Sequence, residues 1–311
     1  PSLYRTSSVF ITTFNVNGCI PRLDGIPSWL NCKGILPPDF YIIGLQEMDF
    51  SPQAFIMNAS TRHMEWKVII AKSFPKGTDY DLINEIRLVG ILLAVYRRVG
   101  SKIKVRPSEI DAVMIPTGRC NVFGRALGDK GAVAISMCMN DTAVCFVNVH
   151  FAAHIDGNEK RILDYKHIVK NIRFNKNGKT LFEHDAVFGL LKRAMKLKII
   201  FKNFKEPEFL NFRPTFKYDI NSDKWDSSRK KRVPAWCDRI LWWNQKGVHI
   251  RQKFYDSVPS IRFSDHRPVR ALFYLGVREI DPAEYDKTYR RAFRGASRRN
   301  DYRYKKEETK E

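Results

Sequence analysis

Paired cysteines are missing from this sequence. The six cysteines lie mostly in apolar stretches and show no paired spacing, at Cys19, Cys32, Cys120, Cys138, Cys145 and Cys237. Disulfide-rich scaffolds and zinc fingers need such pairs, so the pattern argues against both. We therefore expect reduced thiols and an intracellular protein.

Long apolar runs are missing too. No run reaches the length of a membrane span, and the N-terminal residues do not have the pattern of a signal peptide. We also find no internal repeat. The chain begins at Pro1, and we expect it to be part of a longer protein.

Acidic side chains are scarce relative to basic ones. The 311 residues include 54 Lys and Arg but only 33 Asp and Glu, which gives a formal net charge of +21. Such a charge predicts a polyanionic partner: a nucleic acid, an anionic membrane face or a multiply phosphorylated substrate. Composition does not choose among the three. The length suits one large domain or two small ones, and a hydrophobic share of 44% is typical of a globular protein.

One stretch, residues 232–242, places an acid and a base at the mouth of an apolar strand. Trp236 and the run from Ile240 to Trp242 predict burial, whereas Asp238 and Arg239 would be costly to bury unless paired. A structural salt bridge explains this pattern as well as a working site does. Residues 264–269 repeat it, with Asp265 and His266 just before another apolar strand.

Together these stretches resemble the closing motifs of the inositol polyphosphate 5-phosphatases, in the endonuclease/exonuclease/phosphatase superfamily. An Asp that orients a His, beside a second Asp that can meet a cation, suits phosphate-ester hydrolysis. The resemblance implies that Asp238 orients His266 and that Asp265 supports the metal side. It covers about residues 8–280. It implies an α/β (α+β) fold, a four-layer α-β-β-α sandwich like that of DNase I.

Two strand ends are candidates for the metal site. Residues 8–16 alternate apolar and polar side chains and end in Asn15 before a turn, where Asn could serve the turn alone. Residues 39–47 form a buried strand that ends in Glu47, and Mg²⁺ prefers such oxygen ligands. The resemblance implies that Asn15 and Glu47 hold Mg²⁺.

Two further stretches resemble phosphate-binding motifs of the family. Lys130 lies in a turn between Gly128 and Gly131, just before an apolar strand, although most such turns are only hairpins. The family motif differs from this sequence at Asp129 and Ala132. His150 and His154 follow the apolar strand 143–149, where a lone His is usually a core residue. The resemblance implies that His150 meets the scissile phosphate and that Lys130 and His154 lie on the substrate side.

A basic loop precedes residues 232–242. The resemblance implies that Lys217, Tyr218, Lys230 and Arg232 grip the phosphate next to the one that is cleaved, which suits cations beside a hydroxyl. A solvated basic loop is the alternative. Each of these residues is a substrate-side or scaffold candidate, as are Lys130, His154 and Arg239.

The resemblance breaks after residue 188. The family strand continues with Gly-Asp-x-Asn, whose Asp activates water and whose Asn helps to hold the phosphate. Here Gly189 leads directly into Leu190, and roughly thirty residues, about one strand-loop-helix unit, are absent. Part of a central strand is then missing, unless residues 186–191 refill it without an acid. Asp185 lies about six residues too early to substitute, roughly 20 Å of extended chain.

Other elements follow from periodicity and composition. We expect strands at residues 67–71 and 88–97, an exposed loop at 73–84, and a helix that carries Ile162, Tyr165, Ile168 and Ile172 on one face. Residues 1–280 would form the domain and residues 281–311 a basic tail, either a frayed helix or disordered.

Three functions remain open. The first is a Mg²⁺-dependent phosphoinositide or inositol polyphosphate 5-phosphatase, impaired by the missing segment and peripheral to membranes in the cytoplasm. The second is a non-catalytic phosphoinositide-binding module of the same fold. The third is a nuclease, which the Lys217–Tyr218 and Lys230/Arg232 pattern disfavours. We therefore expect contact with an anionic membrane and no nucleic acid partner.

Overall fold

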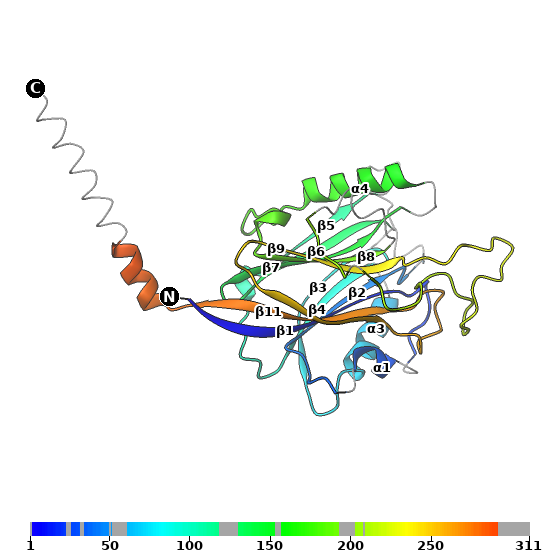
Figure 1. Ribbon diagram of the computed structural model, residues 1–311, viewed down its shortest axis with the longest axis horizontal. Coiled ribbons are helices and arrows are strands. Elements are labelled where there is room, and N and C mark those ends of the chain that lie inside the picture. Colours follow the sequence, from blue (N-terminus) through cyan, green and yellow to red (C-terminus); the bar gives the residue numbers. More distant parts are fainter. Residues whose placement is uncertain are drawn as a thin grey trace, which may run out of the picture.

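The chain folds into two β-sheets that lie face to face, with helices on both outer faces (Figure 1). The computed structural model describes residues 2–22, 26–31, 34–49, 51, 61–117, 130–152, 157–192, 203–207 and 209–291. The layers follow the α-β-β-α order expected from the sequence. In the described ranges, no helix is both long and apolar enough to span a membrane.

The first sheet has six strands in the order β10-β11-β1-β2-β4-β3. Both of its faces are buried: Val9 and Ile11 point into the core between the sheets, while Phe10 and Phe14 pack under the helices. Burial on both faces explains why the central strands are almost continuously apolar. The strands are β1 (Ser2–Asn15), β2 (Phe40–Gln46), β3 (Tyr80–Leu88), β4 (Ile91–Arg98), β10 (Ile250–Ser257) and β11 (Val269–Ile280).

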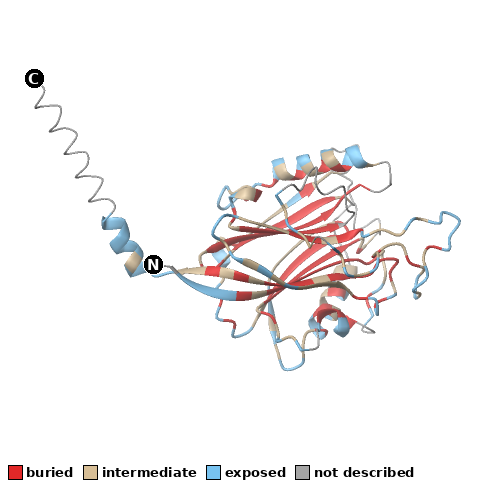
Figure 2. Cartoon of the chain, in the orientation of Figure 1, coloured by how far each residue is buried: buried red, intermediate tan, exposed pale blue. Residues whose placement is uncertain are grey.

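The second sheet has five strands in the order β5-β6-β7-β8-β9. Its inner face supplies the other half of the central core, including Val133, Phe146 and Phe188. Figure 2 shows the buried residues concentrated in these two sheets. The strands are β5 (Asp111–Pro116), β6 (Gly131–Met139), β7 (Thr142–His150), β8 (Ala186–Lys192) and β9 (Asp238–Asn244).

Helices cover the outer faces. Trp29 of α1 (Ile26–Leu30) and Trp66 of α3 (Thr61–Lys72) are buried against the first sheet, and Ile168 of α4 (Asn158–Asn171) against the second. Two single 3₁₀ turns, η1 (Pro107–Glu109) and η2 (Leu181–Glu183), complete the named elements. Residues 282–291 are helical and mostly exposed, within the tail that the sequence predicted.

Two predicted elements are wrong. Residues 67–71 belong to helix α3, not to a strand: the run Val68-Ile69-Ile70 has β-branched side chains, but only Ile70 in it is fully buried. Part of the predicted loop 73–84 is strand β3, which begins at Tyr80. This strand lies at the edge of its sheet and is only partly buried, so its sequence is more polar than that of a central strand.

Strand β8 is complete at the point where the sequence resemblance breaks. Its seven residues pair in parallel with β7 and antiparallel with β9 at every position. Phe188 stacks on Phe146, with ring centroids 5.7 Å apart, and a Cβ on Gly44 would lie 2.7 Å from Leu190 Cδ2. The run Ala186–Leu191 therefore fills the strand, which was one of the two expected outcomes.

Candidate active site

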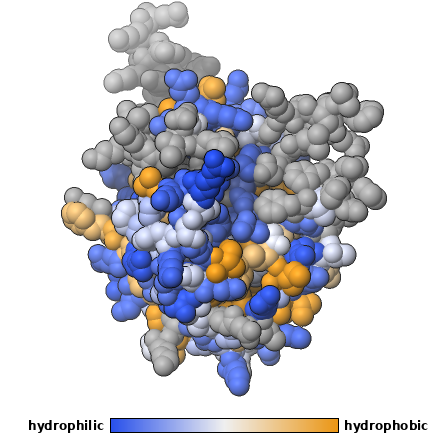
Figure 3. Space-filling view, turned by 90° about the vertical axis from the view of Figure 1, so that its right-hand side faces the viewer, coloured by the Kyte–Doolittle hydropathy of each residue, from blue (hydrophilic) through white to orange (hydrophobic). Residues whose placement is uncertain are grey.

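Charged and polar side chains from both sheets meet at one edge of the sandwich. The parallel pairs β1–β2 and β7–β8 end there, and the antiparallel strands β9 and β11 begin there. This edge is the right-hand end in Figure 1, and Figure 3 views the molecule from that side, where hydrophilic residues surround smaller hydrophobic areas. It carries Asn15, Glu47, His150, Asp238, Asp265 and His266.

Asp238 and His266 form a buried pair. His266 Nδ1 lies 2.7 Å from Asp238 Oδ2, which also accepts a hydrogen bond of 2.7 Å from Thr215 Oγ1. The Phe216 ring stacks on the imidazole at a centroid distance of 4.5 Å. The carboxylate thus fixes Nδ1 as a donor and leaves Nε2 as the ring nitrogen that can meet a substrate.

Glu47, directly after β2, and His150, at the end of β7, form a side-chain contact between the two sheets. Glu47 Oε1 lies 3.3 Å from His150 Nε2. The Glu47 backbone has a positive φ of 55°, which ends β2 and redirects the chain, and its carbonyl accepts a hydrogen bond from the Gly18 amide. Such a φ is uncommon for a residue other than glycine and is often associated with functional sites.

Asn15 pairs with Gln46, the residue before Glu47, and is fully buried. Its Oδ1 accepts the Asn17 amide at 2.9 Å, and its Nδ2 is buried with no hydrogen-bond partner among the residues that the structure describes. Glu47 and Asn15 provide carboxylate and amide oxygens, which suit a hard divalent cation that keeps several waters. No group of three or more Asp, Glu, His or Cys side chains in the described ranges could hold a metal by itself.

A buried amide pair joins the sheets beneath these residues. Gln46 Nε2 donates to Asn148 Oδ1 at 2.7 Å and to Thr13 Oγ1 at 2.9 Å. Asn148 Nδ2 in turn donates to the carbonyls of Leu45 and Leu92, at 3.0 and 2.7 Å. Buried polar groups are costly when unpaired, so this network fixes the position of β2 in the first sheet relative to β7 in the second.

The predicted substrate loop is bound tightly to the loop that carries His266. Lys217 Nζ lies 2.8 Å from Asp265 Oδ2, and the Tyr218 amide donates to the Asp265 carbonyl at 3.0 Å. Arg267 is almost fully buried between the two loops, with its guanidinium 3.9 Å from the Tyr218 ring centroid and 3.1 Å from the Ser264 carbonyl. Lys217 therefore reaches the site, beside the Asp238–His266 pair.

Two predicted substrate residues have structural contacts instead. The Tyr218 hydroxyl donates to the Pro214 carbonyl at 2.8 Å, and its ring is buried between Arg267 and Trp225. Arg239 forms a two-pronged ion pair with Glu206, whose carboxylate also accepts the Tyr255 hydroxyl at 2.9 Å. These contacts favour a scaffold role for both residues, which was one of the two alternatives that the sequence left open for each.

Lys230, Arg232 and Lys130 are the remaining substrate candidates within the described residues. Lys230 is exposed, and Arg232 lies 3.9 Å from the buried Asp226 through Nη1. Lys130 is half-buried just before Gly131, whose φ of 143° and contact with the Ile115 carbonyl leave no room for a Cβ. His154 and Asp129 lie outside the described residues.

Position 192 is the end of β8 and lies between two site residues. In the register of the sheet, Lys192 pairs with His150 on one side and with Asp238 on the other. Asp185 lies at the opposite end of β8, where its carboxylate binds Arg278 at 2.6 Å and the Ala143 amide at 2.8 Å. As expected, Asp185 does not reach the site.

Sequence reasoning missed four residues that shape the site. Thr215 and Phe216 directly precede Lys217, and Arg267 directly follows His266, so these neighbours were the available signal. Glu206 had no signal, because its partner Arg239 is distant in sequence.

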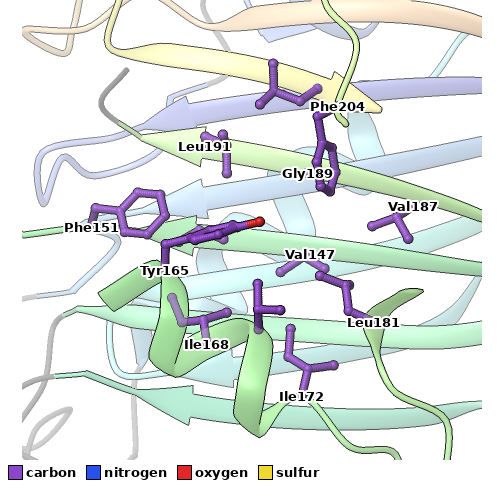
Figure 4. Close-up of a pocket in the computed structure, with 13 residues that line it drawn as sticks. Val147, Phe151, Tyr165, Ile168, Ile172, Leu181, Val187, Gly189, Leu191 and Phe204 are labelled. Atoms are coloured by element: carbon purple, nitrogen blue, oxygen red, sulfur yellow. The ribbon is translucent and has the colours of Figure 1, made fainter. Parts of the chain in front are cut away.

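An apolar pocket lies elsewhere, between α4 and the outer face of the second sheet (Figure 4). Its volume is about 30 Å³, room for little more than one water. Tyr165, Ile168 and Phe204 line it together with residues of β7 and β8, and none of its lining residues is acidic or basic. The pocket therefore offers no acid, base or cation for catalysis, and the site at the strand ends remains the candidate active site.

Comparison with known families agrees with this geometry. The model of endonuclease/exonuclease/phosphatase family 2 matches residues 12–191 and 189–272. The chain belongs to this family. The two matched segments meet at residues 189–191, the same place at which the sequence resemblance breaks.

Curated relatives in this family are 5-phosphatases. The chain is 35% identical to type II inositol 1,4,5-trisphosphate 5-phosphatase of Mus musculus, over 90% of this chain and 31% of that protein. It is 31% identical to phosphatidylinositol 4,5-bisphosphate 5-phosphatase INP51 of Saccharomyces cerevisiae, over 88% of this chain and 32% of that protein. The chain thus spans about a third of the length of these relatives.

A solved structure shares the whole fold. The inositol polyphosphate 5-phosphatase domain of SpSynaptojanin, in complex with inositol (1,4)-bisphosphate and calcium ion, has a TM-score of 0.76 and 26% identity, with 95% of this chain and 94% of that one covered. A Cimex nitrophorin, at 16% identity, has a TM-score of 0.62 and covers 88% of this chain and 99% of its own, which shows the fold alone. The expected DNase I-like sandwich is therefore confirmed.

Proposed function

We propose that this chain is an inositol polyphosphate 5-phosphatase domain that binds phosphoinositide or soluble inositol polyphosphate head groups and hydrolyses them slowly. One observation carries the proposal: the Asp238–His266 pair lies at the same end of the sandwich as Glu47, His150 and Asn15. Relatives and a structural neighbour that act on or bind inositol phosphates support the substrate class.

The side chains suit a phosphoryl group. His266 presents Nε2 because Asp238 holds Nδ1, and His150 lies beside Glu47 on the neighbouring sheet. Both imidazoles can donate to phosphoryl oxygens, where charge develops during hydrolysis. Lys217, held beside Asp265, adds a cation for the neighbouring phosphate.

Magnesium is the metal that these residues fit best. Glu47 and Asn15 would hold it through oxygen atoms, and the bound ion would neutralise phosphoryl charge. The buried Asn15 Nδ2, without a partner among the described residues, is a ready donor to an oxygen of the same phosphate.

Hydrolysis should be slow because no acid stands at the end of β8. The register puts Lys192 between His150 and Asp238, and Asp185 is bound at the far end of the strand. General-base assistance is typically worth about 10²–10⁴ in rate. The same observation supports the second candidate, a phosphoinositide-binding module without catalysis. In both cases we propose a cytoplasmic protein peripheral to anionic membranes, without a nucleic acid partner.

An insertion tests this proposal. A family-type segment that begins with Gly-Asp-x-Asn, placed directly after Leu190 so that its Asp takes position 192 of β8, should raise phosphate release from a soluble inositol 1,4,5-trisphosphate by about 10²-fold or more. The matched control carries the same insertion with Ala in place of its Asp and Asn. If the unmodified chain already turns over substrate as fast as the restored one, another group activates the water and the missing-acid argument fails.

A further inference from the structure

The basic tip, defined here as residues 228–233, is a turn that the buried Asp226 holds in place. Asp226 Oδ2 accepts the Arg232 amide at 2.9 Å, and Oδ1 accepts the Ser228 amide at 3.1 Å. The Lys231 amide also donates to the Ser228 carbonyl at 3.0 Å. Hydrogen bonds from Ser228 and from the Arg232 amide lower the pKa of Asp226 to about 2. The tip therefore keeps its shape at neutral pH.

The tip carries an exposed aliphatic side chain among four cations. Val233 is 69% exposed and directly follows Arg229, Lys230, Lys231 and Arg232, of which the first three are exposed. Figure 1 shows the segment between β8 and β9 extending beyond the strand ends on the right, and Figure 2 shows that its far part is exposed. An apolar side chain flanked by basic residues at a projecting point is typical of an interface with anionic lipid.

Other exposed aliphatic side chains lie at the same end. Ile220 is 47% exposed, and its neighbour Asn221 donates to the Arg262 carbonyl at 2.7 Å. Ile20 is 61% exposed, and Cys19 Sγ lies 3.0 Å from the Phe263 carbonyl. Both side chains thus flank the loop of residues 262–267, which leads to His266.

We propose that the basic tip docks on an anionic lipid bilayer, with Val233 entering the interface and Arg229 and Lys231 contacting lipid phosphates, while Lys230 and Arg232 stay candidates for the head group. The inference extends the proposed function by naming the surface that meets the membrane. The tip is attached to the site, because the Asp226 amide donates to the Lys217 carbonyl at 3.1 Å and Lys217 Nζ pairs with Asp265.

Val233 distinguishes a bilayer from a nucleic acid. Cations would attract either polyanion, whereas an aliphatic side chain gains free energy only where it leaves water. The tip presents no aromatic side chain for base stacking, which single-stranded nucleic acid sites generally use. The combination of one aliphatic residue and four cations therefore favours lipid.

Vesicle binding tests the docking surface. The chain, Val233→Asp and Lys231→Glu are sedimented with phosphatidylcholine vesicles that contain or lack phosphatidylserine, without any phosphoinositide. Controls with equal charge changes are Val99→Asp and Lys102→Glu, both exposed at the opposite end of the first sheet. We expect each tip variant to bind anionic vesicles at least about fivefold more weakly, the value of one cation near such a surface. The controls should bind like the parent.

Binding of soluble inositol (1,4)-bisphosphate by calorimetry separates the two proposals. Unchanged head-group affinity in the tip variants supports docking, whereas a parallel loss would make the tip part of the head-group site and overturn it. Docking is also overturned if Val233→Asp binds vesicles like the parent, or if the parent binds single-stranded DNA but not anionic vesicles. If the parent does not bind the soluble head group while the tip variants still bind anionic vesicles more weakly than the parent, docking stands and the proposed function fails.

Discussion

His266 is restrained from three directions. Asp238 holds Nδ1, the Phe216 ring covers one face of the imidazole, and Ser264 Oγ accepts the His266 amide at 3.2 Å. Ser264 Oγ also lies 2.7 Å from the Asn15 carbonyl, so the histidine loop is attached to the end of β1. The imidazole is thus preorganised relative to Asn15, one of the two proposed metal ligands, as the proposed phosphoryl transfer would require.

Glu47 should carry most of the metal affinity. Glu47→Ala removes the only carboxylate among the two proposed ligands, so calorimetry should show the heat of Mg²⁺ binding disappear. Glu65→Ala is the matched control, because Glu65 is an exposed acid of α3 that pairs only with Arg62 at i,i+3 among the described residues. Equal heats for the parent chain and Glu47→Ala would remove Glu47 from the site.

Arg267 should hold the two loops together. Arg267→Ala removes charge-assisted hydrogen bonds to backbone carbonyls and the cation–π contact with Tyr218. We expect the free energy of unfolding in urea to fall by about 2–4 kcal/mol. Arg262→Ala is the control: its exposed pair with Asp223 should contribute at most about 1 kcal/mol. A loss at Arg267 no larger than at Arg262 would contradict this role.

At this scale, the sequence predicted the residues better than their contacts. Asp238 and His266 each precede an apolar strand, and this pattern led to the pair. The scaffold contacts of Tyr218 and Arg239 depend on Pro214 and Glu206, and no periodicity in the sequence relates those partners to them. Side-chain pairing across loops is set by tertiary packing, which local patterns do not encode.

At the scale of helices and strands, local patterns likewise predicted the elements only where burial leaves a clear apolar run. Strands β2 and β7 were predictable because burial at every position makes them short apolar runs. Helix α3 was not, because its few buried positions, Trp66 and Ile70, give no clear helical stripe. The filling of β8 was left open by the sequence, since only pairing with β7 and β9 shows which residues continue the strand.

The register of β8 predicts the position at which an added acid would raise the rate of phosphate release. Residues directly opposite each other on paired strands share a face of the sheet, so an aspartate at position 192 would lie on the face of His150 and Asp238. Lys192→Asp should raise phosphate release from inositol 1,4,5-trisphosphate at least about tenfold, part of the usual value of a general base. Lys192→Ala, which removes the cation without adding an acid, should give much less. Equal rates in both variants would show that a carboxylate there has no catalytic use.

For the whole molecule, the net charge of +21 should make membrane binding depend on salt. The screening length falls from about 30 Å at 0.01 M salt to about 8 Å at 0.15 M. Binding of the chain to phosphatidylserine vesicles should therefore weaken steadily over this range in a sedimentation assay, while binding to neutral vesicles stays low throughout. Salt-independent binding would mean that burial of apolar side chains dominates.

The pairing of β1 with β11 also affects how the chain can fold. Among the strands that the structure describes, β1 comes first along the chain and its antiparallel partner β11 comes last, with pairing from Ser2↔Ile280 to Thr13↔Val269. Contacts this distant in sequence form slowly, because a long loop must close before they can form. During synthesis β1 can pair with β2, but its other edge stays open until residues 269–280 leave the ribosome. An unpaired edge in the middle of a sheet can recruit other chains, so nascent chains that stall before residue 269 should be unusually prone to aggregate.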